Sequence, residues 1–146
     1  MLSSLFEHFT DSARRAMALA NQQGIRNRRE FIHPEQILWG ILMVPDCTAV
    51  RVLNQFGVDG GSVLTALEQI CEAPEQEVRQ PPLAKKVLEH AINAAREFKH
   101  EHIGTEHLLL GLLKLQDTAA SAILHNAGVI YDSAAALTAN FESGSK

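Results

Sequence analysis

The densest group of side chains capable of chemistry lies in the segment His100-Glu-His-Ile-Gly-Thr-Glu-His107. Imidazoles and carboxylates both ligate divalent metals, so this segment is a candidate metal site. Its spacing fits no standard zinc pattern, because His102 is expected on a loop and His107 inside a helix. In a simpler interpretation, Thr105 caps that helix and Glu106 interacts with the helix dipole in the first turn. His107 is then a surface or partly buried hydrogen-bonding residue, and we predict neither a bound metal nor another cofactor.

Other candidates for chemistry are few. The sequence contains no Gly-x-Ser-x-Gly, His-Glu-x-x-His or Walker-type motif. Cys47 and Cys71 share no Cys-x-x-Cys spacing, and we expect both to be buried structural thiols in a reduced protein. The run Arg26-Asn-Arg-Arg29 is expected to be a solvated basic loop, or else a site that attracts an acidic partner segment. We therefore predict that the protein is not an enzyme.

Length and charge exclude further classes of protein. The chain has 146 residues and is 46% hydrophobic, which fits one ordinary domain with its own core. Its formal charge of −4 argues against a nucleic-acid-binding protein. No apolar run is long enough to span a membrane, and the first residues do not resemble a secretory signal. We expect a cytoplasmic protein.

An internal repeat organises the chain. When the sequence is shifted by 71 residues, residues 31–42 align on residues 102–113 without a gap. The same offset relates further positions downstream, which include Asp46, Leu53 and Gly57 with Asp117, Leu124 and Gly128. A constant offset indicates a tandem duplication. We predict a single domain over residues 1–146, with a first repeat at 9–71, a linker at 72–81, a second repeat at 82–141 and a flexible tail at 142–146.

Hydrophobic spacing predicts the same four helices in each repeat. Gly40 and Gly111 interrupt the second, central helix at matched positions and indicate a close helix contact there. Gly57 and Gly128 follow the third helix and suit a left-handed helix end. The fold class is therefore all-α, with two tandem four-helix repeats packed in pseudo-two-fold symmetry. The expected ranges are 11–24, 34–44, 47–56 and 60–71, then 82–97, 105–115, 118–127 and 131–141.

The doubled motif is similar to that of a known family. Ile103-Gly-Thr-Glu-His-Leu-Leu-Leu-Gly-Leu-Leu113 resembles the hallmark of the Clp N-terminal domain, also called the Clp repeat domain. Phe9-Thr-Asp-Ser-Ala-Arg-Arg15 resembles its opening helix, and Leu83-Ala-Lys-Lys-Val-Leu-Glu89 resembles the start of its second repeat. In Clp-type unfoldases this domain precedes the ATPase rings. The sequence leaves open whether the chain is part of such an ATPase or a free-standing Clp-repeat protein.

The resemblance implies a noncatalytic interaction module of the Clp chaperone and protease system, which docks adaptors or captures unfolded substrates. Its partners would be Clp ATPase or protease components, adaptor proteins and unfolded proteins. Some members bind phosphorylated arginine with the glutamate of each Gly-Thr-Glu-His motif, which corresponds here to Glu106 and Glu35. Thr105 and His107 complete the second motif, and His33 begins the first. Binding is expected in the groove between the repeats or on the faces that begin at these glutamates.

The first motif departs from the family pattern. It runs His33-Pro-Glu-Gln36, in which Pro34 removes both an amide donor and the threonine hydroxyl. Arg26, Arg28 and Arg29 also place positive charge near Glu35. Glu106 is therefore the better candidate for guanidinium recognition. Two alternatives stay open, namely a metal-binding or enzymatic protein built on the segment 100–107 and a purely structural helical dimer.

Overall fold

The computed structural model describes residues 7–29, 32–71 and 83–139. Eight helices lie within this part of the chain. The first repeat contains α2 (Asp11–Arg26), α3 (Pro34–Leu42), α4 (Thr48–Gln55) and α5 (Gly60–Cys71), and the second contains α6 (Ala84–Glu97), α7 (Thr105–Lys114), α8 (Ala119–Asn126) and α9 (Tyr131–Thr138). The all-α prediction is confirmed, and the predicted linker at 72–81 and tail at 142–146 lie outside the described residues.

Most predicted helix boundaries agree with the structure to within two residues; α2 runs on to Arg26 rather than residue 24, and α6 begins at Ala84 rather than residue 82. α3 stops at Leu42 rather than at residue 44, because Pro45 follows and disfavours helical backbone at Val44. α9 stops at Thr138, short of the predicted residue 141. None of the helices in the described ranges has the length and apolar character needed to cross a membrane.

The backbone repeats as faithfully as the sequence. Arg28, Asp46 and Gly57 have positive φ angles of 58°, 57° and 71°. Their counterparts at the 71-residue offset, Lys99, Asp117 and Gly128, have angles of 60°, 67° and 92°. Left-handed backbone is uncommon for residues other than glycine, so its recurrence at matched positions supports the duplication. Gly57 and Gly128 follow the ends of α4 and α8, as predicted.

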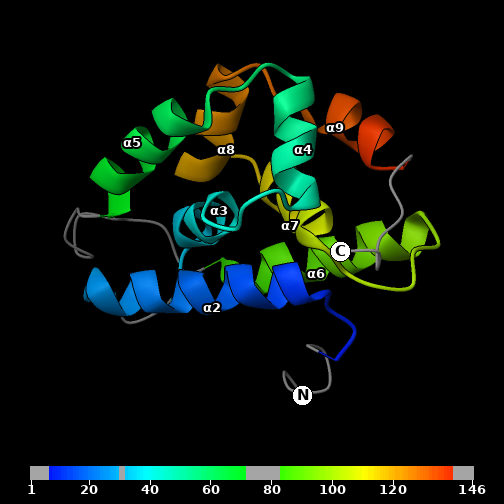
Figure 1. Cartoon of the computed structure of the whole chain (residues 1–146), viewed down its shortest axis with the longest axis horizontal. Helices are drawn as coiled ribbons and strands as arrows, with labels where there is room; N and C mark the ends of the chain where they lie inside the picture. Colours follow the sequence, from blue (N-terminus) through cyan, green and yellow to red (C-terminus); the bar gives the residue numbers. More distant parts are fainter. Residues whose placement is uncertain (1–6, 30–31, 72–82, 140–146) are drawn as a thin grey trace.

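The central helix of each repeat lies against the first one. A Cβ atom on Gly40 of α3 would overlap the carbonyl oxygen of Ala16 in α2. A Cβ atom on Gly111 of α7 would overlap that of Val87 in α6, and residues 16 and 87 are matched by the repeat. The predicted close contact is therefore confirmed in both repeats. Figure 1 shows α3 and α7 in the middle of the molecule, with α2 and α6 below them.

The third helix of each repeat packs on the other repeat. α4 contacts α7 and α9, whereas α8 contacts α3 and α5 (Figure 1). This reciprocal exchange is the pseudo-two-fold relation predicted from the sequence. It buries α7 from Thr105 to Leu113 on all sides, so the second motif lies inside the molecule.

Both cysteines are buried and free, as predicted. Cys47 precedes α4 and Cys71 ends α5. Burial raises the pKa of the Cys71 thiol to about 12, so that thiol stays protonated at neutral pH.

We expect Gly111→Ala to lower the free energy of unfolding by about 2–3 kcal/mol, because the new methyl group forces α6 and α7 apart. Urea denaturation measures this loss. Gly60→Ala is the matched control, since a Cβ at Gly60 would meet nothing within 4 Å and should leave stability unchanged or slightly higher. An equal loss for both variants would contradict the close contact.

Candidate functional site

The two central helices begin with the same hydrogen bond. Gln36 accepts the backbone N–H of His33 on its Oε1 atom at 2.7 Å. In α7, the Nδ1 atom of His107 accepts the backbone N–H of Gly104 at 2.9 Å. Gly104 is therefore the N-cap residue, and the prediction that Thr105 caps α7 is wrong. The side chain of the third helical residue already binds the N-cap amide, as in a capping box.

Thr105 instead caps a helix of the other repeat. Its Oγ1 atom accepts the backbone N–H of Ala49, near the start of α4, at 3.0 Å. Cys47, the N-cap residue of α4, makes no side-chain capping bond, whereas its counterpart Thr118 caps α8. Pro34 occupies the position matched to Thr105 and has no hydroxyl group. The repeats have diverged in a complementary way, which gives the Thr105 hydroxyl a structural role at the interface between them.

His107 is fully buried, which corrects the expectation of a surface or partly buried residue. Burial, together with nearby His100, lowers its pKa to about 3, so the ring is neutral at physiological pH. Because Nδ1 accepts the Gly104 N–H, the ring proton must lie on Nε2. Nε2 then donates to Nδ1 of His100, at 2.9 Å.

The segment 100–107 forms a compact cluster that does not suit a metal ion. His100, Glu106 and His107 each offer a ligand atom, and these atoms lie within 4.8 Å of one another. His102 is exposed and lies outside this group. A metal on Nε2 of His107 would displace the ring proton and break the bond from Gly104. Metal-binding histidines normally donate from their other nitrogen, whereas this one accepts, so the geometry opposes the metal alternative.

The glutamate of the first motif forms a buried ion pair. Nη1 of Arg29 lies 3.3 Å from Oε2 of Glu35, and both side chains are at most 1% exposed. Nη2 of Arg29 donates to the carbonyl oxygens of Ile70 and Cys71 at 3.0 and 3.2 Å. The expectation that Arg29 belongs to a solvated loop is therefore wrong, although Arg26 and Arg28 are exposed. A buried arginine is stable here because its guanidinium has a counter-charge and carbonyl acceptors.

Within the described part of the chain, no arginine or lysine contacts the glutamate of the second motif. Glu106 is 1% exposed, and its Oε2 atom has no hydrogen-bond partner. Burial raises its pKa, partly offset by a bond from its own backbone N–H. His107 is the nearest ionisable group, with Nδ1 4.0 Å from Oε2, but that ring is neutral. The position matched to Arg29 is His100, which binds His107 instead of the carboxylate.

Gly104 leaves room for the Glu106 carboxylate. A Cβ atom on Gly104 would overlap Oε1 of Glu106, so any other residue would move this side chain. The matched residue in the first motif is His33, which has a side chain, and Glu35 there binds Arg29. The glycine of the second motif thus helps to hold Glu106 at the start of its own helix.

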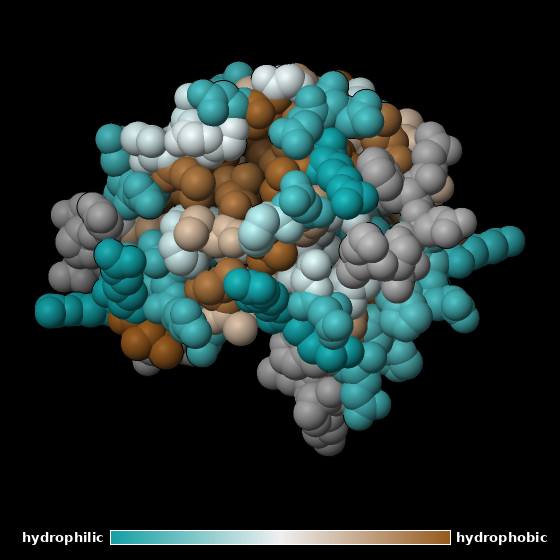
Figure 2. Space-filling view, in the orientation of Figure 1, coloured by the Kyte–Doolittle hydropathy of each residue, from teal (hydrophilic) through white to brown (hydrophobic). Residues whose placement is uncertain are grey.

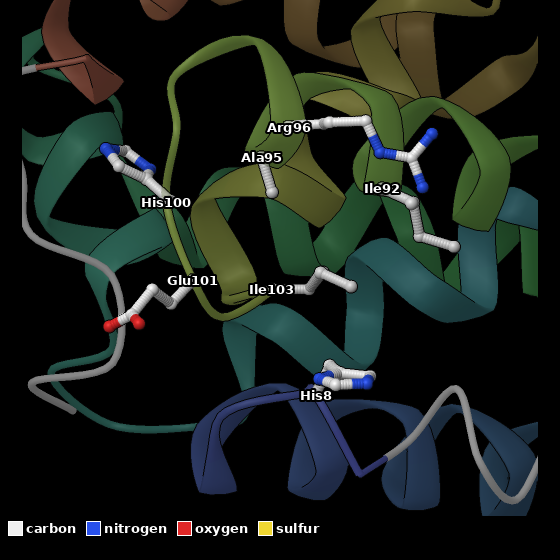
Figure 3. A pocket seen from close by; sticks show the side chains of 7 residues that line it. All are labelled: His8, Ile92, Ala95, Arg96, His100, Glu101 and Ile103. Atoms are coloured by element: carbon white, nitrogen blue, oxygen red, sulfur yellow. The ribbon is translucent and has the colours of Figure 1, made fainter.

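A cavity of about 370 Å³ lies next to His100. Figure 3 shows His100 and Glu101 on one side of it, Arg96 on the other side, and Ile103 between them. His8 also lines the cavity, and its carbonyl oxygen accepts the backbone N–H of Ile103 at 2.8 Å. The walls therefore come from the segment before α2 and from the second repeat, with an apolar floor and charged groups around it.

The sequence of this chain matches a known protein family. The chain matches the model of the Clp repeat (R) N-terminal domain over residues 8–127 and 82–141. The chain belongs to this family. It is 31% identical to the chaperone protein ClpB of Oceanobacillus iheyensis over 128 residues, which are 86% of the chain and 16% of that protein. It is 36% identical over 130 residues to a ClpA homolog of Cyanidium caldarium, an ATP-binding subunit of the ATP-dependent Clp protease. The chain covers 15% of that protein, so it spans about one sixth of the length of these relatives.

Solved structures of Clp N-terminal domains share the fold. The N-terminal domain of the Arabidopsis thaliana chaperone ClpD superposes with a TM-score of 0.66 at 24% identity, covering 91% of this chain and 97% of that one. The Hsp104 N-terminal domain of Candida albicans gives a TM-score of 0.69 at 19% identity, covering 94% and 93%. At these identities the likeness establishes the helical architecture alone.

The structure distributes the candidate residues between two separate environments. Glu35 is tied to Arg29 and the end of α5, whereas Glu106 lies with His100 and His107. Sequence reasoning assigned Arg29 to the surface and missed its bond to Glu35. The repeat aligns Arg29 with His100, a residue of the candidate cluster, and this alignment was the sequence signal that Arg29 lies near Glu35.

We expect glutamine substitutions at the two matched glutamates to have opposite effects on stability. Glu35→Gln leaves the Arg29 charge buried without a counter-charge and should cost about 3 kcal/mol. Glu106→Gln removes a buried charge that no described residue balances, and it should raise the free energy of unfolding at pH 7 by about 1 kcal/mol.

The gain at Glu106 should depend on pH. A carboxyl whose pKa is raised in the folded state destabilises the fold only as pH rises above its ordinary value of 4.5. The advantage of Glu106→Gln should therefore fade as the pH falls below about 4.5. Urea denaturation at pH 4 and pH 7 measures both effects, and a loss of stability in Glu106→Gln at pH 7 would contradict the account.

Proposed function

We propose that this chain is a noncatalytic docking module of the Clp unfoldase system, which holds an adaptor or substrate protein through an arginine side chain bound to Glu106. One observation carries the proposal: among the residues that the structure describes, no cation binds the buried carboxyl group of Glu106, whereas its counterpart Glu35 already binds a guanidinium. A carboxylate and a guanidinium can form two parallel charge-assisted hydrogen bonds. The first repeat contains a related contact, in which Nη1 of Arg29 donates a single hydrogen bond to Oε2 of Glu35.

The incoming guanidinium would take the position that the His100 ring occupies. A ring nitrogen of His100 lies within 4.8 Å of the Glu106 carboxylate, so a group placed there is near hydrogen-bonding reach. His100 is half-buried, and its side chain is hydrogen-bonded to His107. When the ring rotates outward, a hydrogen bond to water can replace this one. The cavity borders His100 but is not lined by Glu106, so the ligand would reach the carboxylate from it only after the ring has moved.

The same cavity favours a phosphorylated arginine over an unmodified one. Arg96 is exposed at its edge and can bind a phosphoryl group with its guanidinium. His8 adds a second nitrogen donor on the adjoining wall. The hydroxyl group of Thr105 is buried and bonded to Ala49, so Arg96 is the better candidate for binding the phosphoryl group.

Apolar surface supports the docking of a protein rather than a small molecule. Figure 2 shows a hydrophobic band on the viewed face between α4 and α5, above α3. Met43, at the end of α3, is 43% exposed. Trp39, Leu42 and Phe56 pack against the core while remaining half-buried. Exposed apolar surface of this kind is typical of protein-interaction sites.

The proposed partners follow from the family. Relatives of this chain are named as chaperones or as ATP-binding subunits of the Clp protease. Clp ATPase or protease components, adaptors and unfolded proteins in the cytoplasm are therefore the partners we propose.

A fluorescent peptide that carries one phosphoarginine tests the site. We expect Glu106→Gln to weaken its binding at least tenfold, since one charge-assisted hydrogen bond contributes about 1.5–3 kcal/mol. Glu89→Gln removes an exposed carboxylate of α6 and should bind as the wild type does. A peptide with unmodified arginine should bind more weakly. Equal affinity of wild type and Glu106→Gln, or no binding by either, would overturn the assignment.

A further inference from the structure

We propose that Arg29 is a built-in ligand of the first repeat, so that the chain presents a single guanidinium site, at Glu106. The assignment of Glu106 rests on the proposed function. The occupancy of Glu35 does not, because it follows from the contacts of Arg29 alone.

The guanidinium of Arg29 uses acceptors from two helices. It binds Oε2 of Glu35 at the start of α3 and the carbonyl oxygens of Ile70 and Cys71 at the end of α5. Arg29 already occupies the side of Glu35 where an incoming guanidinium would bind, with Nη1 3.3 Å from Oε2. A second cation at Glu35 would also be repelled by the buried charge of Arg29.

We call a repeat closed when an arginine of the chain binds its motif glutamate, and open when none does. Two positions of the repeat decide between these states, namely Arg29 or His100 and Gln36 or His107. In the second repeat, Nε2 of His107 donates a hydrogen bond to His100, and this bond holds the His100 ring next to His107. In the first repeat the matched residue is Gln36, whose Oε1 binds His33 and whose Nε2 has no partner. Gln36 therefore makes no hydrogen bond to Arg29, and the Arg29 side chain extends to Glu35 instead.

Side-chain chemistry gives the same division. Arginine is always charged at physiological pH and carries a fork of donors that matches a carboxylate. The rings of His100 and His107 are neutral, since burial lowers the pKa of both. The first repeat thus contains its own cation, whereas no described residue supplies one to Glu106, so we infer that it comes from another molecule. One docking partner per chain follows, although the sequence contains the motif glutamate twice.

The first experiment closes the open site. His100→Arg places an arginine at the position matched to Arg29, where it should bind Glu106. We expect a higher melting temperature and at least tenfold weaker binding of the phosphoarginine peptide. His102→Arg is the matched control, because it makes the same change on the exposed part of the same loop and should alter neither quantity. An unchanged or lower melting temperature in His100→Arg would overturn the proposal.

The second experiment opens the closed site. Arg29→Ala should lower the melting temperature, and added methylguanidinium should restore part of the loss by binding Glu35. Methylammonium at the same concentration should restore less, because it lacks the planar fork of donors. Methylguanidinium should have no effect on the double variant Arg29→Ala/Glu35→Gln. Equal effects of the two cations, or no effect of either, would overturn the proposal, and if Arg29→Ala does not fold, the His100→Arg comparison decides.

Peptide stoichiometry separates this proposal from the proposed function. Wild type should bind one phosphoarginine peptide per chain, and two per chain would show that Glu35 is open and contradict the inference. No binding by wild type would contradict the proposed function alone, since the melting temperatures still test the occupancy of Glu35.

Discussion

A carboxylate buried inside a protein needs either a positive partner or a proton, and this requirement governs the site. Both motif glutamates are placed in the first turn of a central helix, where they are removed from water. In the first repeat Arg29 meets the requirement from within the chain. In the second repeat none of the described residues does so, and burial raises the pKa of Glu106. The functional difference that we propose between the repeats follows from this one electrostatic difference.

The duplicated fold makes that difference visible. Gly40 and Gly111 allow the same close approach of central and first helices, so the two motifs have equivalent backbone surroundings. The exchange of α4 and α8 between the repeats then buries both helix starts. Because the backbone is so similar, the differences between the repeats come from a few side chains. The side chain of Cys47 does not cap α4, and Thr105 of the other repeat caps that helix instead. His100 stands in the second repeat where the first repeat has Arg29.

Most of the fold could be predicted from sequence, because duplication and helix signals are local. The constant offset, the glycines after α4 and α8 and the apolar central helices indicated the eight helices to within a few residues. The side-chain partners could not be predicted in the same way. Arg29 lies in a basic run that resembles a solvated loop, and its burial depends on carbonyl oxygens at the end of α5, far along the chain. Thr105 has the residue type of a cap, but Gly104 ends up in the capping position and Thr105 caps another helix.

The charge state of Glu106 tests the central claim most directly. Carbon-13 NMR of side-chain carboxyls, with the signal assigned by its loss in Glu106→Gln, follows its titration in the free protein and again with the phosphoarginine peptide bound. The account predicts a pKa above the ordinary 4.5 in the free protein and a lower one once the peptide supplies a cation. A free-protein pKa at or below 4.5 would mean that Glu106 already has a positive partner, and would contradict the account.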